Sequence, residues 1–415
     1  MEGTRPQRRA RLLVLGAGPA QLGLLEAARR RGLFVIAVDR DPAAPGFRYA
    51  DRRALISVED EQAVEHLATA DPVDGAIAPG IDWPVAIAAR VADRLGISHP
   101  ITPETALLAT SKLRQRERFA QAGIPQPLHH VCRTLEEAGA AAAELGYPCV
   151  LKPIDRQGQR GLTVVGEPGE LDAAYDRAVD ESRGGILLVE ELVGGPEVTV
   201  NAFSVAGRFH PLTITDRLLA PPPAFGVALA HAWPSSLSAA EVDAAVEAAA
   251  RAAAALGVEA GPTYTQIRIG RHGPRVGELA ARLGGGHDAE LCQAVMGVDL
   301  NDLALRAALG EPIDERALSP VDRAGGGCVR FLVAPTGELQ HVVGDEEARA
   351  RDGIVDVRLY RRPGHRFGEL RRGSDRAGAV IAVGATRAEA QARAAAAAEC
   401  IRFDTVRVEA LASQT

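Results

Sequence analysis

The sequence predicts an α/β and α+β multidomain protein, and three observations support this prediction. At 415 residues the chain is longer than one hydrophobic core usually supports, so two or three domains are expected. Near the N-terminus, short apolar runs alternate with helical patterns, as they do in parallel α/β domains. Further along, strand patterns follow one another across short turns, as they do in antiparallel hairpins.

Composition and charge narrow the class of protein. Charged residues make up 24% of the chain and hydrophobic residues 47%, which is typical of a soluble globular protein. A net charge of -7 argues against nucleic acid as the main partner. The five cysteines are scattered without metal-type spacing, which indicates reduced thiols and a cytoplasmic location. No stretch is long enough to span a membrane, and the arginine-flanked run Leu12–Leu15 is too short for a signal-peptide core.

The chain opens as a βαβ unit. The run Leu12–Leu15, a glycine-containing loop and a helix lead into a second strand, Phe34–Val38. Asp39 after that strand allows a dinucleotide site, but Gln21 replaces the third fingerprint glycine and Pro19 stands where the helix starts. Nicotinamide binding is therefore the weaker interpretation of this loop. Further predicted strands and a helix continue the unit to about residue 100, over residues 54–58, 75–78 and from 84 onward.

Lysine is almost absent from the chain. Of its 47 lysine and arginine residues, only Lys112 and Lys152 are lysines. The ammonium group of lysine is a compact charge on a flexible side chain, whereas the guanidinium group of arginine is planar and presents several fixed donors. A site that contacts a phosphate through a single charged group can therefore require lysine. We infer that these two lysines meet one anionic ligand. The alternative is that both are ordinary surface lysines.

Lys152 lies at the start of a predicted hairpin lid. It ends the apolar run Cys149–Leu151, which predicts a buried strand, and a glycine-rich turn at residues 157–161 and a second strand, Leu162–Val165, follow. The glycines let backbone N–H groups approach phosphate oxygens, and an arginine in the turn adds a charged donor. The loop residues expected to contact phosphate are Gly158, Arg160 and Gly161.

Two more strand patterns, within residues 186–203, flank a short linker with glutamates on both sides. With the lysines and the hairpin lid, this arrangement resembles the ATP-grasp superfamily, in which the two lysines contact the nucleotide phosphates and the lid folds over them. The resemblance implies that Glu190 and the backbone at Glu191 and Val193 hold adenine, and that Glu197 binds the ribose hydroxyls. The alternative is that both outer glutamates are solvated acids at strand ends.

Helical patterns connect these strands. Residues 111–125 resemble the start of an ATP-grasp domain, including its lysine. Further helices are predicted over Leu135–Leu145 and after a capping box formed by Ser238 and Glu241. The proline-rich stretch 220–226 is expected to be a loop that either borders a substrate pocket or is a surface connection.

Residues 263–282 bring a second group of functional side chains. If they form a hairpin centred on His272, Gln266 and Glu278 are cross-strand partners whose Cβ atoms lie roughly 5 Å apart. A carboxylate and an amide oxygen at that distance can hold a hard divalent cation that also binds ATP phosphates. Arg282, on the same face by the two-residue period, can grip the transferred phosphoryl group or a substrate carboxylate.

ATP-grasp enzymes place their magnesium ligands on this pair of strands. The resemblance therefore assigns Glu278 and Gln266 to Mg²⁺ or Mn²⁺, and Arg282 to the anion. Two departures weaken the assignment: an acid more often stands where this chain has Gln266, and an asparagine ligand where it has Ala280. They predict more water on the metal, weaker metal binding or, at worst, lost catalysis.

Gly284–Gly286 and His287 then lead into a helix. The glycines are expected to leave room for a substrate, with Gly285 in its wall and N–H groups at the helix start. His287 either contacts the substrate or caps the helix. The run 278–287 is similar to L-amino-acid ligases, which form dipeptides, and residues 325–401 resemble the C-terminal region of the same ligases and of biotin carboxylase.

The resemblance covers nearly the whole chain and implies its domain organisation. A Rossmann-like domain is predicted over residues 1–108, followed by an ATP-grasp domain over residues 109–320 with a mobile lid subdomain at about 147–197. Residues 321–415 are expected to complete the large domain of the ligase.

The implied function is the ATP-dependent joining of a carboxylate to an amine. ATP with Mg²⁺ would phosphorylate the carboxylate, and Lys152, Arg160 and Arg282 would stabilise the negative charge on the phosphoryl group during its transfer. An amine would then attack the acyl phosphate. Small-molecule substrates are expected, at least one of them an amino acid, with neither nucleic acid nor membrane as a partner; a homodimer is compatible with the sequence. Two alternatives stay open: an enzyme that phosphorylates bicarbonate, as biotin carboxylase and purine-pathway carboxylases do, and a nucleotide-binding protein that has lost catalysis.

Overall fold

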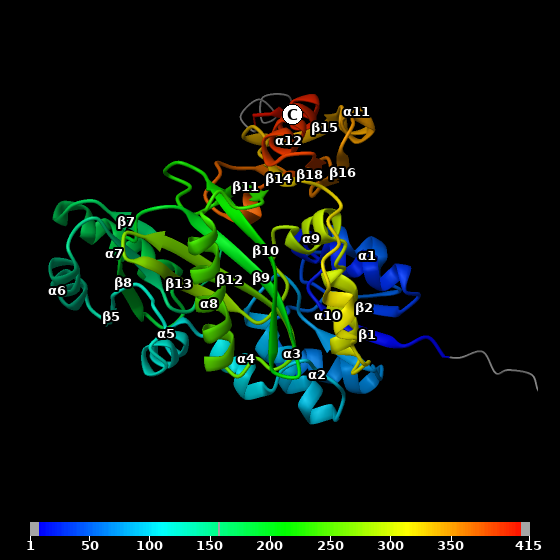
Figure 1. Ribbon diagram of the computed structural model, residues 1–415, viewed down its shortest axis with the longest axis horizontal. Coiled ribbons are helices and arrows are strands. Elements are labelled where there is room, and N and C mark those ends of the chain that lie inside the picture. The colour runs from blue at the N-terminus through cyan, green and yellow to red at the C-terminus, as the bar shows by residue number, and fades with distance from the viewer. Residues whose placement is uncertain (1–7, 157, 408–415) are drawn as a thin grey trace, which may run out of the picture.

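The part of the chain that the structure describes forms four β-sheets with helices between them (Figure 1). The computed structural model describes residues 8–156 and 158–407. In Figure 1 the blue N-terminal sheet and the small teal sheet lie to the right and left of a large central sheet, with the orange to red C-terminal region above. This mixed α/β architecture, with a parallel sheet near the N-terminus, confirms the predicted fold class.

The N-terminal sheet is parallel, with strand order β3-β2-β1-β4. A strand was predicted over residues 54–58, but β3 covers only Arg52–Ala54. It is an edge strand that pairs with β2, and it ends where β2 ends, with Ala54 opposite Val38. The strands and helices of this region are β1 (Arg11–Leu15), α1 (Leu22–Arg30), β2 (Phe34–Val38), β3 (Arg52–Ala54), α2 (Glu61–Ala70), β4 (Gly75–Ile77) and α3 (Trp83–Leu95).

Two short helices, α4 (Pro103–Thr110) and α5 (Lys112–Gln121), lead from this sheet to the small sheet. The small sheet is antiparallel, with order β5-β8-β6-β7, and two helices pack their apolar faces against it. It includes β5, which precedes the lid subdomain predicted from residue 147. Its elements are β5 (His129–Cys132), α6 (Leu135–Leu145), β6 (Cys149–Pro153), β7 (Thr163–Val165), α7 (Leu171–Glu181) and β8 (Leu187–Glu191).

The large sheet has the order β13-β12-β9-β10-β11-β14-β18-β16 and is antiparallel. Strands from beyond residue 320 pair within it, so the C-terminal region extends this sheet. Its strands are β9 (Glu197–Val205), β10 (Arg208–Leu219), β11 (Ala228–Trp233), β12 (Gly261–Gly270), β13 (Gly273–Ala280), β14 (Gly326–Leu332), β16 (Ile354–Leu359) and β18 (Gly378–Gly384).

Helix α8 begins at the predicted capping box, which the structure confirms: Ser238 accepts from the Glu241 N–H, and the Glu241 carboxylate accepts from the Ser238 N–H. A last, three-stranded sheet has the order β17-β15-β19. The remaining elements are α8 (Ala239–Ala255), α9 (Asp288–Met296), α10 (Leu300–Ala308), β15 (Gly337–Val343), α11 (Asp345–Ala350), β17 (Arg366–Phe367), α12 (Arg387–Cys400) and β19 (Arg402–Val406). Short 3₁₀ segments cover Pro19–Gln21, Pro45–Tyr49, Pro168–Glu170, Glu315–Leu318 and Gly373–Asp375.

The β12–β13 hairpin confirms the predicted pairing of Gln266 with Glu278, but by a different route. The turn places Gly270 opposite Gly273, which centres the hairpin half a residue before His272. A one-residue bulge at Gly277 then shifts the register, so that Glu278 faces Gln266. Without this bulge Glu278 would point to the opposite face of the sheet.

The N-terminal sheet shares its hydrophobic cores with the rest of the molecule. One core joins Leu13 and Ile36 of the sheet to Phe119 of α5 and to residues of α8, β12 and β13. A second core joins the other sheet face to α1, α9 and α10. Within the described ranges, 8–156 and 158–407, no helix is both long and apolar enough to cross a bilayer.

Replacing Gly75 of β4 with alanine is expected to lower the free energy of unfolding by about 1–3 kcal/mol. The added Cβ would lie 2.3 Å from the carbonyl oxygen of Ala308 in α10, so the helix would have to move away from the sheet. Urea unfolding followed by circular dichroism measures the change. Gly169→Ala is the control, since a Cβ there meets nothing within 4 Å; equal midpoints for the two variants would contradict this packing.

Candidate active site

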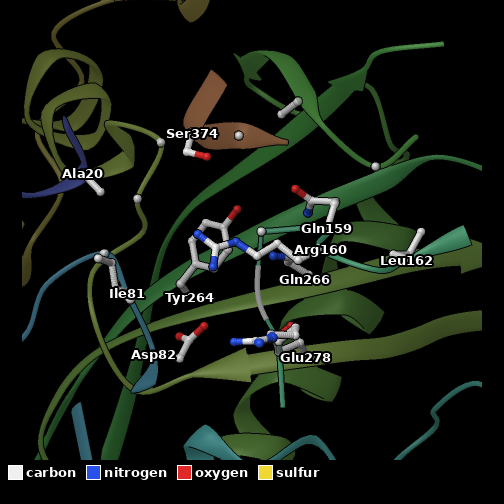
Figure 2. A pocket seen from close by; sticks show the side chains of 18 of the residues that line it. Ala20, Ile81, Asp82, Gln159, Arg160, Leu162, Tyr264, Gln266, Glu278 and Ser374 are labelled. Carbon is white, nitrogen blue, oxygen red and sulfur yellow. The ribbon is translucent and has the colours of Figure 1, made fainter. Parts of the chain in front are cut away.

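A cavity of about 580 Å³ lies where the N-terminal, small and large sheets meet (Figure 2). Its size is in the usual range for small-molecule sites. Twelve of the fourteen residues predicted for the site line it: Lys112, Lys152, Gly158, Arg160, Glu190, Glu191, Val193, Glu197, Gln266, Glu278, Arg282 and Gly285. In Figure 2 the side chain of Arg160 projects into the cavity from the glycine-rich loop, and Asp82 and Glu278 lie together at one end.

The carboxylate of Glu190, on β8, binds two cations. Its Oε2 lies 2.6 Å from Lys152 Nζ and its Oε1 2.9 Å from Arg116 Nε. Burial alone would raise the pKa of Glu190, but the two cations outweigh burial and lower it to about 2. In the structure this carboxylate fixes Lys152 in the cavity wall. The contact between Glu190 and adenine that the resemblance implies stays a prediction.

Arg116, on α5, is a site residue that the sequence analysis missed. Its side chain is only 2% exposed, and besides Glu190 it bonds the carbonyl oxygens of Val276, at 3.2 Å, and Gly277, at 2.7 Å. It therefore ties the small sheet to the bulge that orients Glu278. Because the helix around Arg116 is rich in charge, its sequence pattern is that of a solvated surface, and no signal singles this arginine out.

Lys112 reaches the same cavity from the first turn of α5. Its ammonium donates to the carbonyl oxygen of Arg156 in the glycine-rich loop. Burial would raise the pKa of Glu278, but Lys112 and Arg282 outweigh burial and hold it below its ordinary value. Both lysines of the chain thus stand near one ionised carboxylate, as expected of residues that meet one ligand.

The metal ligands predicted from the sequence are only partly accessible to a cation. Glu278 is an ionised carboxylate facing Gln266, but Oε1 of Gln266 accepts from Arg217 Nη1 at 2.9 Å. Among the described residues no group of three acidic, histidine or cysteine side chains forms a metal cluster. This donor set fits Mg²⁺, which usually takes one or two carboxylates and completes its shell with water and substrate phosphates.

Glu197, predicted to bind ribose, is paired with two arginines of the large sheet. Arg217 bonds Oε1, and Arg268 Nη2 lies 2.7 Å from Oε2. Burial disfavours the charge on Arg217, yet Glu197 outweighs this effect and raises the pKa of Arg217. Neither arginine was singled out from the sequence, because each lies in a strand whose two-residue alternation suggests only a solvated face.

Arg282, the predicted anion clamp, is held from the N-terminal domain. Its Nη2 lies 2.6 Å from Oδ1 of Asp82, which precedes α3, and its Nη1 donates to the carbonyl oxygen of Leu283 at 2.9 Å. Burial, with Glu278 nearby, raises the pKa of Asp82 in spite of Arg282. The clamp is therefore oriented by a residue about 200 positions away in sequence, which local patterns do not reveal.

The three glycines after the clamp allow protein groups to approach closely. A Cβ on Gly284 would lie 2.6 Å from the Tyr264 ring, one on Gly285 2.9 Å from the carbonyl oxygen of Gly80, and one on Gly286 2.4 Å from the ring of His231. The sequence predicted that these glycines leave room for a substrate. In the structure, neighbouring protein atoms occupy the space where a side chain at each of these positions would lie.

Two predicted site residues lie outside the cavity lining. His287 has a left-handed backbone, with φ at 61°, and its Nε2 lies 2.6 Å from the hydroxyl of Tyr360. It is only 3% exposed and stands at the N-cap position of α9, where its side chain makes no capping hydrogen bond. Gly161 also has a positive φ, 68°, and a Cβ there would meet Pro153 at 2.8 Å.

The structure adds a histidine that the sequence analysis missed. His231, on β11, lines the cavity, and its Nδ1 lies 2.9 Å from Oδ1 of buried Asp288. A carboxylate on one ring nitrogen fixes the tautomer and leaves the other nitrogen for proton transfer. The loop 220–226 also contributes, since Phe225 and Gly226 line the cavity.

The loop after β1 is not arranged as a dinucleotide site. Both carboxylate oxygens of Asp39 accept backbone N–H groups, from Ala17 and Asp41, each at 2.9 Å. The Gln21 side chain packs beneath the loop and donates to the carbonyl oxygen of Pro79 at 2.6 Å. The acid that would bind a ribose is therefore used to shape the loop itself.

Two family models match the chain. A model of the ATP-grasp domain matches residues 145–290, and a model of the L-amino acid ligase C-terminal domain 2 matches residues 330–406. The first match spans the hairpin lid, the linker and the β12–β13 pair, and the second spans most of the C-terminal region.

Individual proteins resemble the chain over most of its length. It is 29% identical to protein y4rH of Sinorhizobium fredii over 394 residues, which are 92% of this chain and 80% of the relative. It is 28% identical to the formate-dependent phosphoribosylglycinamide formyltransferase of Burkholderia cenocepacia, over 94% of this chain and 95% of the relative. The crystal structure of L-amino acid ligase from Bacillus licheniformis matches with a TM-score of 0.80 at 21% identity, covering 97% of this chain and all of that one. The structural likeness shows a shared fold.

Glu190→Gln is expected to lower the free energy of unfolding at neutral pH by about 3 kcal/mol, since one pKa unit is worth roughly 1.4 kcal/mol. Folding lowers the pKa of Glu190, so its stabilisation is complete above about pH 4.5 and is lost as the pH falls toward about 2. The difference between wild type and variant should therefore shrink in acid.

Urea unfolding over a series of pH values measures this difference. Glu144→Gln is the matched control, because Glu144 is exposed and pairs with the partly exposed ring of His130. The control should change stability by less than about 0.5 kcal/mol at every pH. A difference for Glu190→Gln that stays constant from neutral pH into acid would contradict an ionised, doubly paired carboxylate.

Proposed function

Because the chain belongs to the ATP-grasp superfamily of carboxylate–amine ligases, we propose that it joins the carboxylate of an amino acid to an amine and converts ATP to ADP and phosphate. ATP and Mg²⁺ are the cofactors of this superfamily. The observation that supports the proposal most is the convergence of Lys112, Lys152, Arg282 and Glu278 on one cavity. The C-terminal match favours an amino acid as substrate.

The nucleotide would lie between the small and large sheets. Adenine would contact the backbone of the linker at Glu191 and Val193, and the ribose would lie beside Glu197, all of which line the cavity. The triphosphate would extend toward Lys112 and Lys152. Lys152 is already held in place by Glu190, so little reorganisation is needed when the phosphates arrive.

The first chemical step is phosphoryl transfer to the carboxylate. A carboxylate oxygen attacks the γ-phosphorus, the bond from that phosphorus to the bridging oxygen of ADP breaks, and an acyl phosphate forms. Lys152, Arg160 and Arg282 stabilise the negative charge on the phosphoryl group during transfer. A bound Mg²⁺ at Glu278 would neutralise further charge on the phosphates.

The second step is attack of the amine on the acyl carbon. The C–N bond forms, the C–O bond to phosphate breaks, and the nitrogen loses a proton. His231, fixed by Asp288, is placed on the cavity wall to accept that proton. The glycine-rich loop carries Arg160, so its closure would both complete the cation set and keep water from the acyl phosphate.

Two other functions compete with this one. An enzyme that activates a one-carbon acid is supported by the 28% identity to a formate-dependent formyltransferase, and bicarbonate is the other small acid to test. A protein that binds nucleotide without turnover is suggested by Ala280 at a usual ligand position and by the bond between Gln266 and Arg217.

The test of the proposed function is ADP release with ATP and Mg²⁺ across a matrix of paired amino acids, with bicarbonate and formate in separate wells. Release that requires an amino acid and yields an amide product is expected, and Glu278→Gln should reduce it at least a hundredfold because the metal loses its charged ligand. Glu315→Gln, at an exposed acid that begins the 3₁₀ segment Glu315–Leu318, is the matched control and should keep full activity. Release with formate or bicarbonate alone would favour the one-carbon enzyme, and bound ATP without any release would favour the inactive protein.

Gln266→Met tests the second metal ligand, since it keeps the side-chain length but removes the amide oxygen. We expect the Mg²⁺ concentration for half-maximal activity to rise about threefold to tenfold, with a smaller fall in maximal rate than in Glu278→Gln. A Mg²⁺ titration at saturating ATP measures both quantities. An unchanged requirement for Mg²⁺ would show that Gln266 serves only Arg217.

A further inference from the structure

We propose that the hydroxyl oxygen of Tyr360 binds the amino group of the amine substrate, and that His287 and Glu290 hold this oxygen in the role of a hydrogen-bond acceptor. The inference rests on the proposed ligase function and adds to it one substrate-binding residue, Tyr360, and two positioning residues. It concerns the attack of the amine on the acyl phosphate, for which the cavity must hold a nitrogen that carries N–H donors.

Three side chains form a chain of hydrogen bonds that leads into the cavity. Tyr360, which follows β16, lines the cavity, and its hydroxyl lies 2.6 Å from Nε2 of His287. Nδ1 of the same ring lies 3.3 Å from Oε1 of Glu290. Tyr360 and His287 are both buried, so the contact between them is shielded from solvent.

Glu290 is an ionised carboxylate, and the fold holds it in place. Burial would raise the pKa of Glu290, but the charge of Arg358 and the hydrogen bond with His287 outweigh burial and lower it to about 2. Arg358, on β16, places its Nη1 3.2 Å from Oε1 of this carboxylate. Gly23 of α1 leaves room for it, since a Cβ at that position would lie 2.0 Å from Oε1.

The ionised carboxylate fixes the direction of the hydrogen bonds. A carboxylate only accepts, so Nδ1 of His287 carries the proton and donates it to Glu290. The neutral ring then has an unprotonated Nε2, which accepts the single O–H of Tyr360. The tyrosine oxygen is left with only its lone pairs for the cavity, so it can accept a hydrogen bond from an N–H group but cannot donate one.

The backbone of His287 supports a role for its side chain. Its φ of 61° lies in the left-handed region, which histidine adopts at a cost, whereas glycine, present at the three preceding positions, adopts it freely. The side chain makes no capping hydrogen bond to α9, so the start of the helix does not explain a histidine here. Its contacts with Tyr360 and Glu290 do explain it.

Acceptors for an amine are scarce in this cavity. Eight acidic residues of the described chain line it. Glu278 is the proposed metal ligand, and the other seven are bonded to donors of the protein: Asp39, Glu59, Asp82, Asp155, Glu190, Glu191 and Glu197. Tyr360 therefore supplies an acceptor that is bound neither to a cation nor to a metal ligand.

Tyr360 and His231 meet the same short segment of the chain. Gly286, directly before His287, lies so close to the His231 ring that a Cβ on it would come within 2.4 Å of that ring. His231 also packs edge-on against Phe331, which belongs to the same hydrophobic core as Tyr360. An amine between the two side chains can donate one N–H to the Tyr360 oxygen and another to His231, and its lone pair stays free to attack the acyl carbon.

Tyr360→Phe removes the hydroxyl and keeps the ring. It is assayed with the pair of amino acids that gives the fastest ADP release in wild type. We expect kcat/KM for the amine partner to fall at least about tenfold, while KM for ATP and for the acid partner stay within about twofold of wild type. Tyr175→Phe, at a tyrosine whose hydroxyl bonds the carbonyl oxygen of Arg133 outside the cavity, is the matched control and should match wild type. An unchanged kcat/KM for the amine, or an equal loss for all three substrates, would overturn the proposal.

His287→Asn tests the positioning role. Asparagine tolerates the left-handed backbone but has no atom in the place of Nε2, so the Tyr360 hydroxyl loses its fixed direction. We expect kcat/KM for the amine to fall about threefold to tenfold, and the double variant with Tyr360→Phe to lose no more than Tyr360→Phe alone, since both changes act through one hydroxyl. Losses that add in the double variant would overturn the hydrogen-bond chain.

The direction of the hydrogen bonds can be measured in the wild-type protein without turnover. ¹⁵N NMR of protein labelled at histidine distinguishes the two neutral tautomers from the protonated ring, and the signals that disappear in His287→Asn belong to His287. We expect a neutral ring protonated on Nδ1 at neutral pH. A ring protonated on Nε2, or on both nitrogens, would overturn the acceptor role of Tyr360.

The two proposals fail in different ways. Amine-dependent ADP release that is unchanged in Tyr360→Phe would overturn this inference and leave the ligase function standing. The expected tautomer of His287 in a protein that releases no ADP with any amino acid would confirm the hydrogen-bond chain and contradict the ligase function.

Discussion

The carboxylate of Glu190, buried between Lys152 and Arg116, is the interaction on which the rest of the site depends. A lone buried charge would be expensive, so each member of this trio requires the others. Because Arg116 also bonds the carbonyl of Gly277, the same trio fixes the bulge that turns Glu278 into the cavity. One cluster therefore sets the positions of Lys152 and Glu278, the residues proposed to bind phosphate and metal.

The cavity is built from parts of the chain that are distant in sequence. Asp82 of the N-terminal domain orients Arg282, which follows β13 of the large sheet, and the carbonyl of Gly80 packs against Gly285. The C-terminal region contributes Tyr360, whose hydroxyl lies 2.6 Å from His287 Nε2. Since the N-terminal sheet shares its hydrophobic cores with the large sheet, these parts are held together by packing as well as by charge.

Local sequence patterns singled out residues whose composition or strand position is distinctive. They missed residues whose role depends on tertiary contacts with distant parts of the chain. The rarity of lysine pointed to Lys112 and Lys152, and alternation along a hairpin predicted the pairing of Gln266 with Glu278. Arg116 could not be recognised, because a buried arginine and a solvated one have the same sequence pattern until their partners are known. The close contacts beside Gly284–Gly286 could not be predicted for a similar reason. Tertiary packing decides which atoms lie next to a glycine, and the sequence does not show them.

The central claim is that a carboxylate, rather than water, receives the phosphoryl group. The most direct measurement is the transfer of ¹⁸O from a substrate labelled in its carboxylate to the phosphate that is released, followed by mass spectrometry. The account predicts one ¹⁸O atom in each phosphate, because the attacking carboxylate oxygen stays with phosphorus when the amine displaces it. Unlabelled phosphate, formed at the same rate as ADP, would mean that water attacks ATP and would contradict the account.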